Sequence, residues 1–230
     1  MFRSLNIDKL VGMQEYLQSI GETFCPFLLP AQKESLLLFS EYNLKSDATP
    51  QARIFYAGLL HTELLRKMRA RQSSVREHNL LCENLVLQLP DALIPGKELF
   101  GWPHWLLKIT YTKVGVLFGK FWIGERDTSK SGAEIPSTPY HFLSIRTAIK
   151  PVDNRFFSKA PQLTEEYVRS CDSGENVLSD MLGLQPPPCI LEAGNLDPIS
   201  ATEETFHRMI EEMCESNFYE ELCVVGKTKL

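Results

Sequence analysis

Three histidines are the side chains of this chain with the widest chemical use. His61 falls on the apolar stripe of a helix expected over residues 51–72, His141 opens an expected strand, and His104 stands between two tryptophans. Because imidazole is the commonest protein ligand of haem iron, His61 and His141 are candidate metal ligands. The aromatic cluster around His104 could wall a flat cofactor. Plainer interpretations stay open: a hydrogen-bonded core histidine at position 61, a strand-edge surface histidine at 141 and a packing corner at 104.

A cysteine and an arginine complete the set of candidate site residues. Cys25 precedes Pro26 and could supply a thiolate to iron, although a proline beside a cysteine usually marks a rigid turn with an inert thiol. Arg146 ends the strand that His141 opens, and it could hold a substrate carboxylate through two parallel hydrogen bonds. A plain ion pair between Arg146 and Asp153 explains the same pattern equally well.

Several classes of function leave no signature in the sequence. It has no HExxH, GxGxxG or GxxxxGKS/T motif, and its six cysteines include no CxxC pair, so zinc and nucleotide sites of those types are not favoured. The net charge of −5 and the pI near 5.6 argue against nucleic-acid binding. No apolar run is long enough to cross a bilayer, and Asp8 and Glu15 interrupt the segment where a secretory signal would be apolar. We therefore expect a cytoplasmic protein that does not bind membranes.

The elements that must position these residues alternate without a strict β-α-β order. Apolar runs bounded by turn residues predict strands, and 3.6-residue periodicity predicts a long helix whose basic C-terminal stretch, from Arg66 to Arg71, is expected to be solvated. The pattern predicts an α+β fold, with helices packed on a central, mostly antiparallel sheet. The expected strands lie near residues 35–42, 84–89, 114–123 and 139–147.

The C-terminal part of the chain reads as a separate unit. A main domain is expected over residues 1–183, ending in a helix over 164–182. Three consecutive prolines make residues 184–198 a linker. Beyond it, a capping box predicts a helical appendage over residues 199–230, which packs on the main domain or on a second subunit of a homodimer.

Short motifs in the central region carry a resemblance to a known family. In chain order they are Cys25-Pro26-Phe27, Gly119-Lys120-Phe121, Thr138-Pro139, Ile145-Arg146, Asp153 and Phe156-Phe157. This series resembles an uncharacterised bacterial family found beside natural-product biosynthesis genes. That family is distantly similar to the YqcI/YcgG proteins, which include haem-dependent N-hydroxylases of guanidino amino acids. The sequence departs from their pattern at Trp122, which stands in the segment where a histidine would be expected.

The resemblance implies an oxidoreductase of secondary metabolism. Haem iron would activate oxygen for the N-hydroxylation of a small amino acid or amine, Trp122 would lie at the cofactor, and Arg146 would hold the carboxylate of this small-molecule substrate. The alternative is a non-catalytic binding or partner protein that kept the fold and lost the cofactor site, as the tryptophan at position 122 suggests.

Overall fold

The structure of the protein is a computed structural model that describes residues 2–4, 7–44, 50–89, 94–129, 131–150, 152–157, 160–175 and 177. The linker predicted at 184–198, the appendage predicted at 199–230 and the domain boundary at 183 lie outside the described residues. Within these ranges, no helix combines the length and the apolar composition needed to cross a bilayer.

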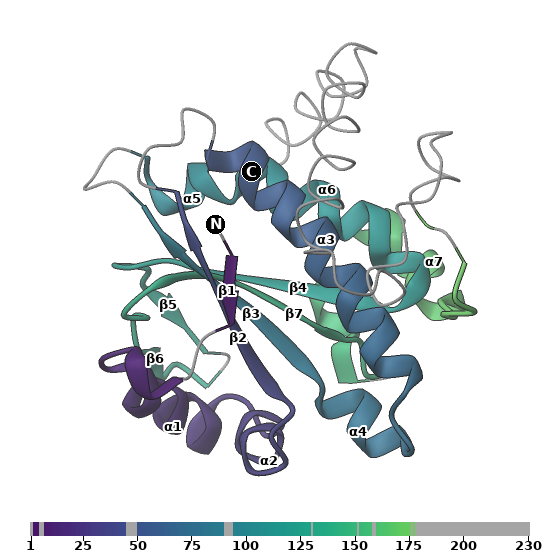
Figure 1. Ribbon diagram of the computed structural model, residues 1–230, viewed down its shortest axis with the longest axis horizontal. Helices are drawn as coiled ribbons and strands as arrows, with labels where there is room; N and C mark the ends of the chain where they lie inside the picture. The colour runs from purple at the N-terminus through teal and green to yellow at the C-terminus, as the bar shows by residue number, and fades with distance from the viewer. Residues whose placement is uncertain are drawn as a thin grey trace.

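A five-stranded sheet forms the centre of the molecule (Figure 1). Its order is β1 (Phe2–Ser4), β2 (Leu37–Asn43), β3 (Cys82–Gln88), β7 (His141–Thr147) and β4 (Val116–Phe121). Only β2 and β3 run parallel, and the other three pairings are antiparallel. The predicted α+β class with a mostly antiparallel sheet is therefore confirmed, and each of the four predicted strands is present.

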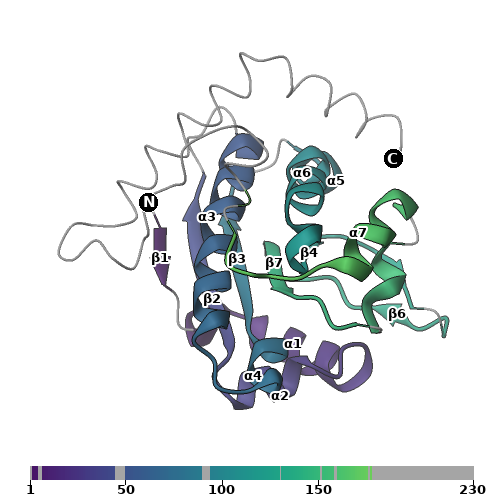
Figure 2. The same cartoon turned by 90° about the vertical axis from the view of Figure 1, so that its right-hand side faces the viewer.

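The α3 helix (Pro50–Ala70) covers one face of the sheet. Proline suits its first turn because the missing N–H would have no helical partner there. Figure 2 shows α3 alongside β2 and β3, with α6 (Gly101–Tyr111) beside β4. The two helices touch closely at Gly58, where a Cβ atom would lie 2.4 Å from Leu107 Cδ1. This face holds the larger part of the core.

The α1 helix (Met13–Thr23) packs against the opposite face of the sheet. The helical spacing of Leu10, Met13, Leu17 and Ile20 predicts a helix over residues 6–21. The α1 helix begins later, at Met13, because Gly12 precedes it with a left-handed backbone (φ 77°). Its buried residues Met13 and Leu17 meet the strand side chains Phe39 and Phe142. The apolar side chains of neighbouring strand positions therefore serve two separate cores, as expected where helices cover both faces of a sheet.

Short elements connect these layers. The short helices are α2 (Leu28–Lys33), α4 (Val75–Leu80), α5 (Gly96–Leu99) and α7 (Thr164–Arg169). The 3-10 turns are Ile7–Lys9, Thr112–Val114, Val152–Phe157 and Pro161–Leu163. A small two-stranded ladder, β5 (Asp127–Thr128) with β6 (Glu134–Ile135), lies in the polar segment between β4 and β7.

The prediction of a helix over residues 164–182 is wrong for residues 170–175. Helix α7 ends at Arg169, and Ser170 leaves the helical region with φ −52° and ψ 133°. The Lys150 ammonium donates hydrogen bonds to the carbonyls of Val168 and Ser170, and the Cys171 N–H donates to the Lys113 carbonyl. Partners from other elements thus replace the next turn of the helix.

Candidate functional site

The sheet separates the residues that the sequence suggested for one site. Side chains alternate between the two faces of a strand. On β7, His141 shares its face with Leu143 and Ile145 under α3, whereas Arg146 shares its face with Phe142. A carboxylate held by Arg146 would therefore lie across the sheet from iron held by His141 or by a residue of α3. The structure does not bring the predicted substrate contact and the predicted metal ligands together.

His61 is a buried member of a polar network beneath α3. Its Nε2 lies 2.9 Å from the hydroxyl of Tyr42, and its Nδ1 lies 3.3 Å from Oε1 of Glu83. The Ser40 hydroxyl donates a hydrogen bond of 2.5 Å to the same Glu83 oxygen. Because both ring nitrogens have partners, this arrangement does not fit His61 as an axial ligand of haem.

His104 is also occupied by the protein. Its Nε2 lies 2.9 Å from the carbonyl oxygen of Phe118, so the ring donates to the backbone of β4. Burial, with the nearby charge of Lys120, lowers the pKa of His104 to about 3, which keeps the ring neutral. The geometry agrees with a packing role at the α6–β4 contact.

Trp122 directly follows β4 at the end of the sheet where His141 opens β7. Phe121 and Phe142 form the last pair of β4 with β7, so continuing this register brings Trp122 opposite His141. Trp122 packs against the Gly96 backbone, where an added Cβ would lie 2.1 Å from Trp122 Cγ. The buried Nδ1 of His141 has no hydrogen-bond partner among the described residues, and burial lowers the pKa of this histidine. Of the two predicted metal ligands, His141 is therefore the one with a ring nitrogen that makes no hydrogen bond to the described residues.

Arg146 is held by Asp153 in a two-point ion pair. Its Nη1 and Nη2 donate to the two carboxylate oxygens at 2.8 and 2.7 Å, and the Ile149 N–H donates to Asp153 at 2.7 Å. The Asp153 side chain is 1% exposed. This geometry matches the interpretation of Arg146 as the partner of Asp153 in an ion pair. Cys25 follows Phe24, the C-cap of α1, and its backbone N–H donates a hydrogen bond to the Ile20 carbonyl.

The two predicted metal ligands differ in whether a ring nitrogen is available. Among the described residues there is no cluster of three or more His, Cys, Asp or Glu side chains able to hold a metal ion. Of the two predicted metal ligands, His61 has both ring nitrogens engaged and His141 retains one. The haem assignment stays a prediction.

A cleft of about 560 Å³ opens elsewhere, at the C-terminal half of α3. Its walls come from α3, α4, the residues before β4, the end of β7 and residues 170–174. The volume lies within the range of about 300–1,000 Å³ that is usual for small-molecule sites. The charged side chains that line it are Arg66, Lys67, Arg69, Lys150, Glu63 and Asp172. Four cationic side chains and two carboxylates therefore line this cleft, in a chain whose net charge is −5.

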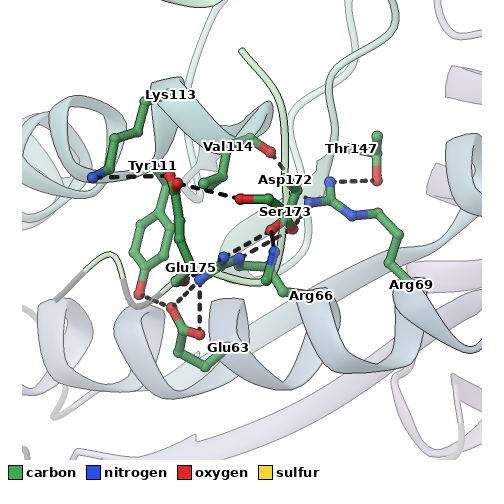
Figure 3. A network of polar contacts seen from close by, with 11 residues as sticks. Glu63, Arg66, Arg69, Tyr111, Lys113, Val114, Thr147, Asp172, Ser173 and Glu175 are labelled. Atoms are coloured by element: carbon green, nitrogen blue, oxygen red, sulfur yellow. Dashed lines mark hydrogen bonds and ion pairs between the residues drawn. The ribbon is translucent and has the colours of Figure 1, made fainter. Parts of the chain in front are cut away.

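Two arginines converge on one carboxylate in the wall of this cleft (Figure 3). Arg66 donates from Nε to Oδ2 of Asp172 at 3.1 Å and from Nη2 to Oδ1 at 2.7 Å. Arg69 Nη2 donates to Oδ2, and the Gly174 N–H donates to Oδ1 at 3.1 Å. Burial alone would raise the pKa of Asp172, but the hydrogen bonds and charges of the arginines outweigh it and lower the pKa.

Lys150 adds a positive charge that carbonyls hold in place. Its ammonium donates to the Val168 and Ser170 carbonyls at 2.9 and 2.7 Å, and it lies 5.9 Å from the Tyr167 ring centre. Among the described residues, no carboxylate lies within ion-pair distance of it. Carbonyl dipoles orient the ammonium without neutralising it, so its charge can act on an anion in the cleft.

Sequence reasoning missed this cleft because the basic stretch of α3 was expected to be solvated. That expectation is wrong for Arg66 and Arg69, which are 6% and 7% exposed. Their separation of three residues was the available signal, since positions i and i+3 share one face of a helix. Asp172, their main partner, comes 106 residues after Arg66 and has no motif around it.

Comparisons of the chain with models of known families, with curated proteins and with solved structures found no match. The resemblance to the natural-product family and to the YqcI/YcgG proteins therefore stays a prediction.

Proposed function

We propose that the protein binds a small anionic molecule in the cleft beside α3. The observation that carries this proposal is the convergence of Arg66 and Arg69 on a single carboxylate in the cleft wall. Planar guanidinium groups recognise carboxylate and phosphate by parallel hydrogen bonds, and they are preferred for partly buried anion sites. The proposal develops the alternative of a non-catalytic binding protein and makes its partner a small molecule.

The electrostatics of the cleft support an anionic ligand over a cationic or neutral one. Once Glu63 and Asp172 are set against Arg66 and Arg69, the positive charge of Lys150, which two carbonyls hold, remains in the wall of the cleft. Opposite charges a few ångströms apart attract by about 1 kcal/mol in water and by several times more near a protein surface. A ligand with one negative charge would balance the charge of Lys150.

An isothermal titration with acetate, succinate and inorganic phosphate tests this function. The wild-type protein is expected to bind at least one of them with a dissociation constant of about 1 mM or tighter, equal to about −4 kcal/mol. Lys150→Met is expected to weaken binding about fivefold, because one charge contact is worth roughly 1 kcal/mol. The control is Lys33→Met, which removes an exposed lysine of α2 outside the cleft. Equal affinities for the two variants, or no binding by the wild type, would contradict the proposal.

A second candidate is the haem-dependent oxygenase suggested by the resemblance, with a cytoplasmic location as the sequence predicts. The buried Nδ1 of His141, without a partner among the described residues, favours it. Its test is an absorption spectrum of protein from haem-supplemented cells, with His141→Ala compared with His104→Ala. A stoichiometric Soret band that is lost only with His141→Ala would support this function, and a colourless protein that fails to bind added haemin would remove its support.

A further inference from the structure

The Asp172 carboxylate accepts hydrogen bonds from Arg66 and Arg69 in the way that a small carboxylate ligand would. Its two oxygens together accept four N–H groups, three from Arg66 and Arg69 and one from Gly174. We propose that these arginines form a carboxylate subsite, which Asp172 fills in the ligand-free protein and which a ligand carboxylate takes over by displacing it. This inference rests on the proposed function and names the chemical group recognised and the means of its entry.

Both arginines also have partners outside the displaced segment. Arg66 Nη1 donates to both oxygens of Glu63 at 3.1 and 3.0 Å, and the Tyr111 hydroxyl donates to Glu63 at 2.8 Å. Arg69 donates to the Thr147 hydroxyl at 3.3 Å. As Figure 3 shows, these partners come from α3, α6 and β7. Both guanidinium groups would therefore keep their positions after Asp172 has left.

The orientation of Arg66 favours a carboxylate over a single-point anion. It presents Nε and Nη2 side by side, one to each oxygen of Asp172. This two-point geometry matches a planar carboxylate, while Arg69 adds a third donor to the oxygen shared with Nε. A ligand carboxylate in the same place would make the same three contacts with Arg66 and Arg69 without new positions for the arginines.

The segment that carries Asp172 has no regular secondary structure and is largely exposed. Cys171, Ser173 and Gly174 are exposed, and no helix or strand includes residues 171–175. Apart from the Asp172 contacts, its ties to other elements include the Cys171 N–H to Lys113 carbonyl bond of 3.0 Å, an Arg66 bond of 2.8 Å to the Glu175 carbonyl and a Lys113–Glu175 ion pair of 4.0 Å. Exposed backbone outside helices and strands is the pattern expected of a segment that opens locally.

Buried residues on both sides limit the extent of this opening. Tyr167 before the segment and Val177 after it are both 0% exposed. They fix the two ends, so the displacement is an outward bulge of residues 171–175.

In the competing arrangement, the ligand binds beside Lys150 while Asp172 stays bound to Arg66 and Arg69 as a fixed part of the cleft wall.

Two measurements separate these arrangements. In the first, Asp172→Asn is titrated with acetate, succinate and inorganic phosphate, beside the control Glu165→Gln, which removes a 73%-exposed carboxylate of α7. Removing the internal competitor is expected to raise carboxylate affinity at least fivefold, while the control changes it less than twofold. In the second, hydrogen exchange of the wild-type segment 170–175 is followed with and without succinate, and the exchange of the Cys171 amide is expected to rise at least fivefold on binding.

Each result supports or overturns the inference. Unchanged affinity in Asp172→Asn, or slower exchange of the segment on binding, would show that Asp172 is a fixed wall. Tighter binding of phosphate than of both carboxylates would overturn the ligand class. The exchange experiment uses the wild-type protein and decides the matter even where Asp172→Asn folds poorly. Binding that weakens in Lys150→Met without displacement of the segment would refute this inference alone, whereas no binding of any anion would refute the proposed function itself.

Discussion

The pair Arg146–Asp153 gives a sharp test of whether a predicted site residue is in fact structural. If Arg146 serves the fold, its loss and the loss of Asp153 should not be additive, because each removes the same ion pair. We therefore propose a double-mutant cycle with Arg146→Met, Asp153→Asn and the combined variant. Both substitutions keep most of the side-chain volume, so the cycle reports mainly on charge and hydrogen bonding.

The expected magnitude follows from the burial of the pair. Asp153 is 1% exposed and accepts three hydrogen bonds, two of them from Arg146, while Arg146 is 22% exposed. Breaking a buried ion pair costs about 3–5 kcal/mol, and partial exposure of the arginine places the expected cost near the lower end, at about 3 kcal/mol. The coupling energy of the cycle should then be about 2 kcal/mol, since a side-chain oxygen of Asp or Asn at position 153 can accept the bond from Ile149 in every variant.

Urea unfolding measures this cost directly. With a slope of about 3 kcal/mol/M for a protein of this size, each single variant should lower the midpoint by about 1 M. The matched control is the exposed pair Glu165–Arg169 on α7, whose side chains are 73% and 77% exposed. Its coupling should be about 0.3–0.5 kcal/mol. Coupling for Arg146–Asp153 as small as in this control would refute the structural role and return Arg146 to the candidates for substrate binding.

Three further predictions concern pH and packing. The pKa of Asp172 lies below its ordinary value of 3.8, so the stability from its arginine contacts is present above pH 3.8 and is lost as the pH falls through the lowered pKa. The difference in unfolding free energy between the wild type and Asp172→Asn should therefore shrink below pH 4. Burial, with the charge of Asp127, raises the pKa of Glu125 to about 6. The Glu125→Gln variant should therefore equal the wild type in stability at pH 4 and exceed it at pH 8. An NMR titration of the Glu125 carboxyl group with a midpoint near 4.5 would contradict this. Gly58→Ala should lower the unfolding free energy by about 1–2 kcal/mol, because the new methyl group meets Leu107 at 2.4 Å and overpacking outweighs the gain in helix propensity; a higher melting temperature would disprove it.

The fold class followed from the sequence because local patterns determine it. The apolar runs near residues 35–42 and 139–147 are bounded by turn residues, and the long helix carries a clear periodicity. The misplaced ends have physical causes outside the pattern. Gly12 starts α1 later than its periodicity suggested, and the contacts of Lys150 with two carbonyls end α7 at Arg169.

The candidate site was less predictable because its partners are far apart in the chain. One part of the answer was nonetheless present in the sequence: His141 and Arg146 lie five positions apart on one strand, so they must face opposite sides of the sheet. The cleft could not be found in this way. Arg66 and Asp172 are 106 residues apart, and the burial of the arginine depends on a segment without regular structure.

The central claim, that the cleft beside α3 binds a carboxylate, can be observed at the arginine that would hold it. The measurement is an NMR titration of the arginine Nε–Hε signals with succinate at constant ionic strength, with the Arg66 signal assigned from its absence in Arg66→Lys. We predict that the Arg66 signal shifts and saturates with a midpoint of about 1 mM or lower, while the signal of exposed Arg169 stays in place. An Arg66 signal that does not move, or that drifts without saturation together with that of Arg169, would contradict the account.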